Sequence, residues 1–197
     1  IVMAAMATIL TQRQRIMTVS DIYRFGQDNV IDRLQSAFNC EFTVGIGLDR
    51  AKQVTKISDR TAIMTVAKGQ LSEDEKIFFL LDMHLPETPT LKNITDYIVR
   101  LEQKLGWIDQ IHVEEYQGID LHEWLIENGY AAELISATYR TQEEIFGLLM
   151  LAVEGGYFKC PQIDVFVEKE SGSIIYETPP IGRLDIFREE MSVFTYS

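Results

Sequence analysis

Acidic residues stand at points in the sequence where apolar segments end. Asp49 directly follows the segment Phe42–Leu48, and Glu114 and Glu115 directly follow the segment Ile108–Val113. Carboxylate oxygens are the ligands that hard divalent cations such as Mg²⁺ and Mn²⁺ prefer in proteins. If the two segments are neighbouring parallel strands, their ends share one edge of a sheet and these acids converge. Two cations held there, ~4 Å apart, would activate a water and stabilise the leaving oxygen in phosphodiester cleavage.

Only one of the two adjacent glutamates should be a ligand, because neighbouring residues on a strand point to opposite faces. Glu114 is favoured since it lies farther from the following helix, and Glu115 stays open as the alternative. Asp59 precedes the next apolar segment and could face the same cations, although a hairpin turn residue is at least as good an interpretation. Each acid, taken alone, is also explained as a solvated charge at the end of a strand.

Basic residues are concentrated in the segment that follows Asp49. They are candidates for contacts with the phosphates of a nucleic acid, and a solvated basic loop is the alternative. These residues are Arg50, Lys52, Lys56 and Arg60. The histidines, in contrast, show no paired metal-ligand spacing, and His112 is interpreted as a core residue within a strand.

The composition allows one soluble domain of ordinary size. The chain has 197 residues, 46% of them apolar, which is enough for a sizeable core. The net charge of −12 counts against a simple basic nucleic-acid binder, because counterion release needs Lys and Arg, but it leaves room for a carboxylate metal site. No apolar run reaches the roughly 18 residues of a membrane span, so we expect an intracellular protein. Because it starts at Ile1, we expect a fragment of a longer chain.

Apolar periodicity predicts the elements that position the acids. Alternating runs at 42–48, 61–67 and 76–83 predict three strands, whose short connections favour an antiparallel meander. Helical stripes then alternate with two further strands, which should run parallel to their neighbours because crossover helices precede them. The predicted helices cover 88–105, a short segment capped by Asp120, and 145–153; the later strands cover 107–113 and 131–137.

This order predicts an α/β fold of the ribonuclease H-like type. Its mixed sheet has five strands, three antiparallel and then two parallel, flanked by helices. The strand at 107–113 is expected to lie beside the strand at 42–48, which would bring Asp49 close to Glu114 and Glu115. A hairpin at 163–167 and 173–176 and a helix at 181–194 are expected as additions, and residues 1–40 form an N-terminal lead-in that is expected to be helical.

Six short motifs, in this order and spacing, resemble one known family. They span Gly45–Ala51, Ser58–Ile63, Val113–Gly118, Thr138–Gln142, Gly155–Pro161 and Arg188–Phe194. Together they resemble the nuclease domain of the large terminase subunit of tailed bacteriophages, over about residues 42 to 194. On this resemblance, residues 41–197 form the nuclease domain.

The resemblance implies an endonuclease that trims concatemeric viral DNA during genome packaging, with Mg²⁺ or Mn²⁺. It implies that Asp49 bridges the metals, that Glu114 (or Glu115) is the second ligand and that Asp59 is an accessory acid. The family's third acid lies in a last helix, so here it is expected beyond Ser197 or among other acids of this chain. These are Asp185, Glu189, Glu190, Glu143 and Glu144.

The implied partners are double-stranded DNA, an ATPase motor domain on the same full-length chain, the portal and the small terminase subunit, in the cytoplasm of the host cell; no membrane partner is implied. Two alternatives stay open. One is another ribonuclease H-like nuclease of the junction resolvase or transposase type, and the other is a non-catalytic interaction module of this fold.

Overall fold

The protein is described from a computed structural model, which defines residues 30–51, 61–159, 165–167 and 174–176. The described helices are α3 (Val30–Phe38), α4 (Leu91–Leu105), α5 (Glu115–Glu127) and α6 (Tyr139–Glu154). The described strands are β1 (Phe42–Asp49), β2 (Ala62–Gln70), β3 (Lys76–His84), β4 (Gln110–Glu114), β5 (Ala132–Ile135), β6 (Phe158–Lys159), β7 (Val165–Val167) and β8 (Ile174–Tyr176).

The main sheet is mixed, with the strand order β5-β4-β1-β2-β3-β6. The strands β1, β2 and β3 pair antiparallel, whereas β4 pairs parallel with β1 and with β5. The predicted meander followed by two parallel strands is therefore confirmed, and so is the ribonuclease H-like arrangement. The sixth strand, β6, was not predicted as part of the sheet. It has two residues, which is too short for an alternating apolar pattern to show.

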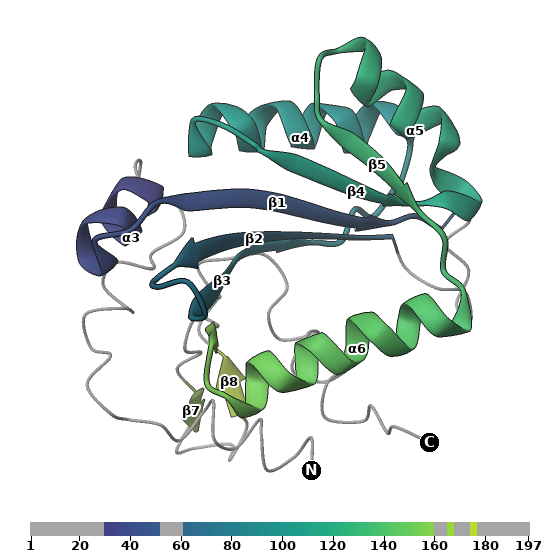
Figure 1. The fold of residues 1–197 in the computed structure, drawn as a ribbon. Helices are drawn as coiled ribbons and strands as arrows, with labels where there is room; N and C mark the ends of the chain where they lie inside the picture. The colour runs from purple at the N-terminus through teal and green to yellow at the C-terminus, as the bar shows by residue number, and fades with distance from the viewer. Residues whose placement is uncertain (1–29, 52–60, 160–164, 168–173, 177–197) are drawn as a thin grey trace.

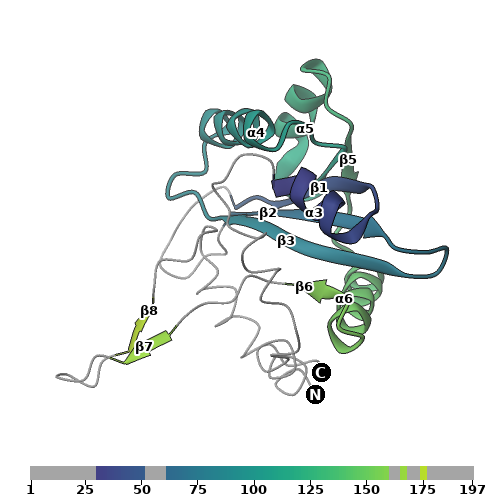
Figure 2. The same cartoon turned by 90° about the vertical axis from the view of Figure 1, so that its left-hand side faces the viewer.

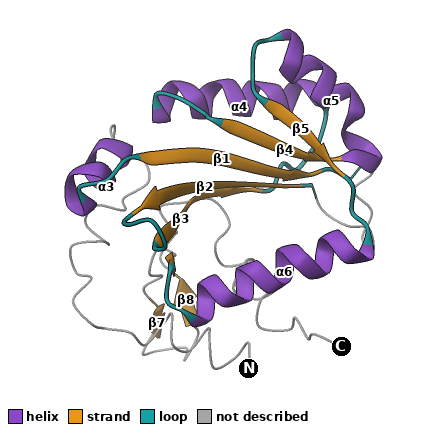
Figure 3. Ribbon diagram, viewed as in Figure 1, coloured by secondary structure: helices purple, strands orange, loops and turns teal. Residues whose placement is uncertain are grey.

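Helices cover both faces of this sheet, as Figures 1 and 2 show: α4 and α5 lie on one face and α6 lies on the other. Alternate residues of β1 are buried under α4 and α5, and this face holds most of the core. The helix α3 adds Val30, Ile31 and Leu34 to the same core. In the secondary-structure colouring of Figure 3, the strands of the main sheet form one layer between the helices α4 and α5 and the helix α6. On the face that α6 covers, the residues of β1 that alternate with the buried ones are exposed or half-buried.

The helix α4 follows its sequence signals closely. The Thr90 side chain accepts a hydrogen bond from the backbone N–H of Asn93 at 3.2 Å, so Thr90 is the N-cap. Gly106 ends the helix with a positive φ of 94°, a conformation that glycine adopts without steric cost. Between these ends, an apolar stripe is buried against the sheet. It consists of Ile94, Ile98, Leu101 and Leu105.

Two predicted helix starts were wrong. The helix α5 begins at Glu115, directly after β4, and not at Asp120, which lies within the helix and pairs with Arg50. The chain can turn from strand to helix there because Gly118 packs closely on Val113, where a Cβ atom would meet Val113 Cγ1 at 2.2 Å. The helix α6 begins at Tyr139 rather than at 145, because the Thr138 side chain caps it by accepting from the N–H of Thr141 at 3.2 Å.

The remaining predictions are only partly covered by the described residues. The strands β7 and β8 pair antiparallel, as the predicted hairpin requires, while the turn expected between them lies outside the described residues. The lead-in before Val30 and the expected helix at 181–194 lie outside them too. Among the described helices, none is both long enough and apolar enough to cross a bilayer.

Candidate metal centre

The ends of β1 and β4 lie side by side. In the parallel pairing of these strands, Leu48 is the partner of Val113, so the next residues along each strand are Asp49 and Glu114. Neighbouring strands are about 4.8 Å apart, a spacing at which two carboxylate side chains can reach a common cation. The expectation that these two strands are parallel neighbours is confirmed, and the two acids come from chain segments far apart in the sequence.

The two acids also share one face of the sheet. Leu48 and Val113 are buried on the face covered by helices, and residues alternate between faces along a strand. Asp49 and Glu114 therefore point to the opposite face, where Asp49 is exposed and Glu114 is half-buried. Like charges this close repel unless a cation lies between them, and oxygen donors suit Mg²⁺ and Mn²⁺. The donor set thus fits the predicted metal.

The two adjacent glutamates differ in their setting. Glu114 is the last residue of β4 and the N-cap residue of α5, and its side chain makes no capping hydrogen bond. Glu115 is exposed in the first turn of α5, where a negative charge interacts favourably with the helix dipole. The face shared with Asp49 belongs to Glu114, so the geometry favours Glu114 over Glu115 as the second ligand.

A third acid does not join this pair within the part of the chain that the structure describes. Among those residues, no group of three or more His, Cys, Asp or Glu side chains could hold a metal ion. Glu143 and Glu144 are exposed near the start of α6, and Glu144 accepts a hydrogen bond from Arg140 at 3.0 Å. The other candidates, Asp59, Asp185, Glu189 and Glu190, lie outside the described residues, so their role stays a prediction.

Arg50 contacts α5. Its side chain is only 10% exposed, and its guanidinium forms an ion pair with Asp120 and donates to the carbonyl oxygen of Gln117 at 3.4 Å. Desolvation alone would raise the pKa of Asp120, but the hydrogen bond and the positive charge of Arg50 outweigh it and hold this pKa below its ordinary value. The guanidinium predicted to contact DNA thus also holds α5. The other predicted contacts, Lys52, Lys56 and Arg60, lie outside the described residues.

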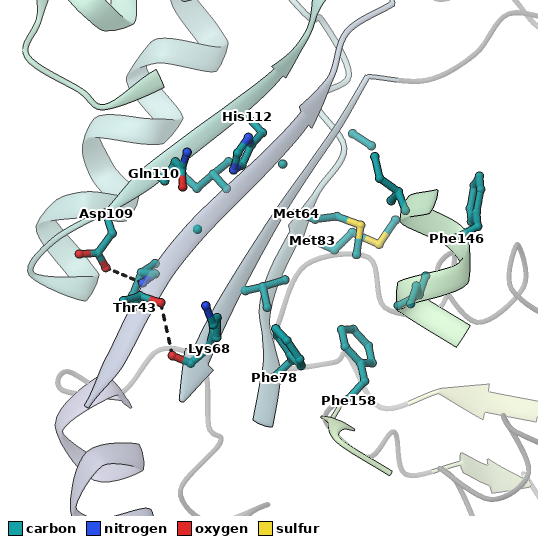
Figure 4. Close-up of a pocket in the computed structure, with 18 residues that line it drawn as sticks. Thr43, Met64, Lys68, Phe78, Met83, Asp109, Gln110, His112, Phe146 and Phe158 are labelled. Carbon is teal, nitrogen blue, oxygen red and sulfur yellow. Dashed lines mark hydrogen bonds between the residues drawn. The ribbon is translucent and has the colours of Figure 1, made fainter. Parts of the chain in front are cut away.

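A hollow of about 870 Å³ lies between the sheet and α6, on the face that carries the acids. Gly45 and Gly47 form part of its floor, and a Cβ atom at Gly47 would meet nothing within 4 Å among the described residues. Figure 4 shows polar side chains of β4 at this hollow together with apolar ones from β2, β3, α6 and β6. The alternating glycines were the sequence signal for this open surface, since they allow another group to approach closely.

His112 belongs to this open face, so its interpretation as a core residue was wrong. Its side chain is 39% exposed, and its Nδ1 atom lies 3.9 Å from Glu133 Oε2 on the neighbouring strand β5. His112 lies two residues before Glu114 on β4, and the alternation of a strand puts both side chains on one face. No sequence pattern predicts this position directly, because strand periodicity does not say which of the two faces is more exposed.

Comparisons with known proteins find similar folds only among solved structures. No protein-family model and no curated protein matches the sequence. The large terminase nuclease of the thermophilic phage G20c with bound cobalt is similar, with 13% identity, 76% of this chain and 79% of that chain covered, and a TM-score of 0.47. The manganese-soaked human cytomegalovirus terminase nuclease domain has 9% identity, coverages of 91% and 85%, and a TM-score of 0.47. The large terminase nuclease domain of Thermus phage P74-26 has 13% identity, coverages of 68% and 69%, and a TM-score of 0.41.

Proposed function

We propose that this chain is a metal-dependent endonuclease domain that hydrolyses phosphodiester bonds in DNA. The proposal is carried by one observation, which is that Asp49 and Glu114 end neighbouring parallel strands and share the same face of the sheet. Two carboxylates at neighbouring strand ends are a donor set that suits a hard divalent cation, which Asp49 and Glu114 would hold.

The residues divide the work as follows. Asp49, which is exposed, would bind the cations from the end of β1, and Glu114 would bind from the end of β4. Bound Mg²⁺ or Mn²⁺ would supply an activated water and stabilise charge on the leaving oxygen. A third acid would come from the residues outside the described part of the chain. Because Asp49 is exposed at the end of β1, an extended substrate such as a DNA strand can reach it.

The biological setting is proposed from the sequence motifs. They suggest double-stranded viral DNA concatemers as the substrate, cut during genome packaging in the host cytoplasm. The partners would then be an ATPase motor domain on the full-length chain, the portal and the small terminase subunit. The net charge of −12 requires that DNA be held by local basic residues and by the cations, not by the overall charge of the protein.

The test uses the full 197-residue chain and two measurements, Mn²⁺ binding by calorimetry and conversion of supercoiled plasmid to nicked and linear forms. The wild type should bind Mn²⁺ and cut, whereas Asp49→Asn and Glu114→Gln should do neither while keeping their circular dichroism spectra. Asp96→Asn, which changes an exposed acid on α4, is the matched control and should behave as the wild type. Intact plasmid and no Mn²⁺ binding by the wild type would exclude the proposal. A strong preference for branched over linear DNA would favour a junction resolvase instead.

A further inference from the structure

The segment just after Asp49 is held on two sides, by a partly exposed contact of Arg50 and by buried contacts of Ala51. Arg50 reaches across to α5, where its guanidinium contacts the Asp120 carboxylate and the carbonyl of Gln117. The next residue, Ala51, is held by Thr61, whose hydroxyl accepts from the Ala51 N–H at 2.9 Å and lies 3.2 Å from the Ala51 carbonyl oxygen. Thr61 is 1% exposed and Ala51 is 8% exposed, so both contacts are shielded from water.

The Arg50 contact links the two halves of the metal centre. Arg50 directly follows Asp49, and α5 directly follows Glu114. Asp49 is exposed at the end of β1, and Arg50, which follows the strand, reaches α5. The ion pair therefore joins the chain just beyond one acid to the helix just beyond the other.

This pair differs from the exposed ion pairs among the described residues. The side chains of Arg140 and Glu144 are 87% and 62% exposed, and those of Lys92 and Asp96 are 80% and 46% exposed. Such pairs contribute little because water screens them and both side chains lose freedom. Here Asp120 is also 54% exposed, but Arg50 is only 10% exposed, and its Nη1 atom contacts both the Asp120 carboxylate and the carbonyl oxygen of Gln117.

We propose that Arg50 is a positioning residue, which sets the separation of Asp49 and Glu114 through Asp120. This inference rests on the proposed function, because it assumes that the two acids bind cations. Groups that orient metal ligands without touching the metal typically change affinity or activity ten- to a hundredfold when they are removed. Arg50 acts on the acids through the backbone of β1 and of α5, so its loss should weaken cation binding more than it weakens the fold.

The test measures the Mn²⁺ dissociation constant, the thermal unfolding midpoint and steady-state plasmid cleavage on the full chain. Arg50→Met should weaken Mn²⁺ binding about ten- to a hundredfold and lower kcat, with little change in KM for DNA. Arg50→Lys should recover part of the affinity, because its ammonium group keeps a positive charge beside Asp120 but its geometry differs from that of the guanidinium. Arg140→Met, which removes an exposed ion pair on α6, is the matched control and should leave all three quantities unchanged.

Asp120→Asn provides a second route, since it removes the partner charge at a position that is 54% exposed and so carries less risk to folding. It should weaken Mn²⁺ binding in the same direction as Arg50→Met.

The outcomes separate the two proposals. A wild type that fails to bind Mn²⁺ overturns the proposed function, and this inference falls with it. A wild type that binds, with Arg50→Met and Asp120→Asn binding equally well, overturns the positioning role alone. A raised KM for DNA at unchanged Mn²⁺ affinity also overturns it, and assigns Arg50 to the phosphate contact predicted from the sequence.

Discussion

Leu48 and Val113 are direct partners in the parallel pairing of β1 and β4, and both are buried under the helices. Their pairing fixes the register of the two strands, and a slip of one residue would move every side chain of a strand to the other face. The acids one position further along, Asp49 and Glu114, are therefore held together by the packing of apolar residues beneath them. The buried residues on one face of the sheet therefore fix the positions of the two acids on the other.

This register distinguishes the two adjacent glutamates. Glu114→Gln should abolish Mn²⁺ binding, because it removes one of the two carboxylates that share a face of the sheet. Glu115→Gln should retain Mn²⁺ binding and lower the stability of the helix by at most about 1 kcal/mol. Calorimetric titration of both variants checks this. The opposite pattern, with binding lost only in Glu115→Gln, would show that the chain turns into α5 differently from this structure.

The close packing of α5 on β4 leads to a prediction about two helical glycines. Gly118→Ala should destabilise the fold by about 1–3 kcal/mol, because its Cβ would overlap Val113 Cγ1. Gly147→Ala, on α6, should instead stabilise by about 0.5–1 kcal/mol, since a Cβ there meets nothing within 4 Å in the part of the chain that the structure describes, and alanine favours the helix. Urea unfolding monitored by circular dichroism measures both. Equal effects of the same sign would contradict the packing of Gly118 on Val113.

The strands of the antiparallel meander and the helix α4 could be predicted from the sequence, because the spacing of their apolar residues reflects burial. The alternation in β1 and β2 and the stripe Ile94, Ile98, Leu101 of α4 record which side chains face the core. The start of α5 is not marked by a comparable sequence pattern. Its N-cap is Glu114, which makes no side-chain cap, and its fit to the sheet depends on Gly118 meeting Val113, a tertiary contact.

The candidate site was predictable only in part for a related reason. The convergence of Asp49 and Glu114 follows from strand order, which the connection lengths indicate. The pairing of Arg50 with Asp120 does not, because an arginine next to an acid at a strand end is equally compatible with a phosphate contact. The position of His112 on the open face likewise depends on which face the later helices cover.

The buried hydroxyl of Thr61 should contribute to the free energy of unfolding through its hydrogen bonds with Ala51. Thr61→Val keeps the shape but leaves the N–H of Ala51 without its acceptor, and a buried unsatisfied group costs about 1–3 kcal/mol. Thr43→Val is the matched control, since Thr43 is exposed on β1 and its hydroxyl donates to the Lys68 carbonyl at a longer 3.4 Å. The measurement is the free energy of unfolding in urea. A Thr61→Val protein as stable as Thr43→Val would show that water or another group replaces the hydroxyl.

The buried carboxyl of Asp82 should make stability depend on pH. Asp82 is 5% exposed and accepts hydrogen bonds from the Tyr97 hydroxyl and, at 2.9 Å, from the Met83 N–H. Desolvation outweighs these bonds and raises its pKa above the ordinary value of 3.8. In the folded state Asp82 thus keeps its proton at a pH where the unfolded chain has lost it. Its contribution is fully present below pH 3.8 and is lost as the pH rises through the raised pKa.

Asp82→Asn should therefore flatten the fall in unfolding free energy between pH 3.8 and neutrality, measured by urea unfolding at a series of pH values. His84 stacks on Tyr97 with ring centroids 4.1 Å apart, and burial lowers its pKa, which contributes a slope of the opposite sign below its ordinary value of 6.5. The comparison is thus repeated in a His84→Gln background, with Asp96→Asn as the exposed control. If Asp82→Asn and Asp96→Asn give the same pH profile in that background, Asp82 is ionised in the folded protein as readily as in the unfolded chain, and its burial carries no energetic penalty.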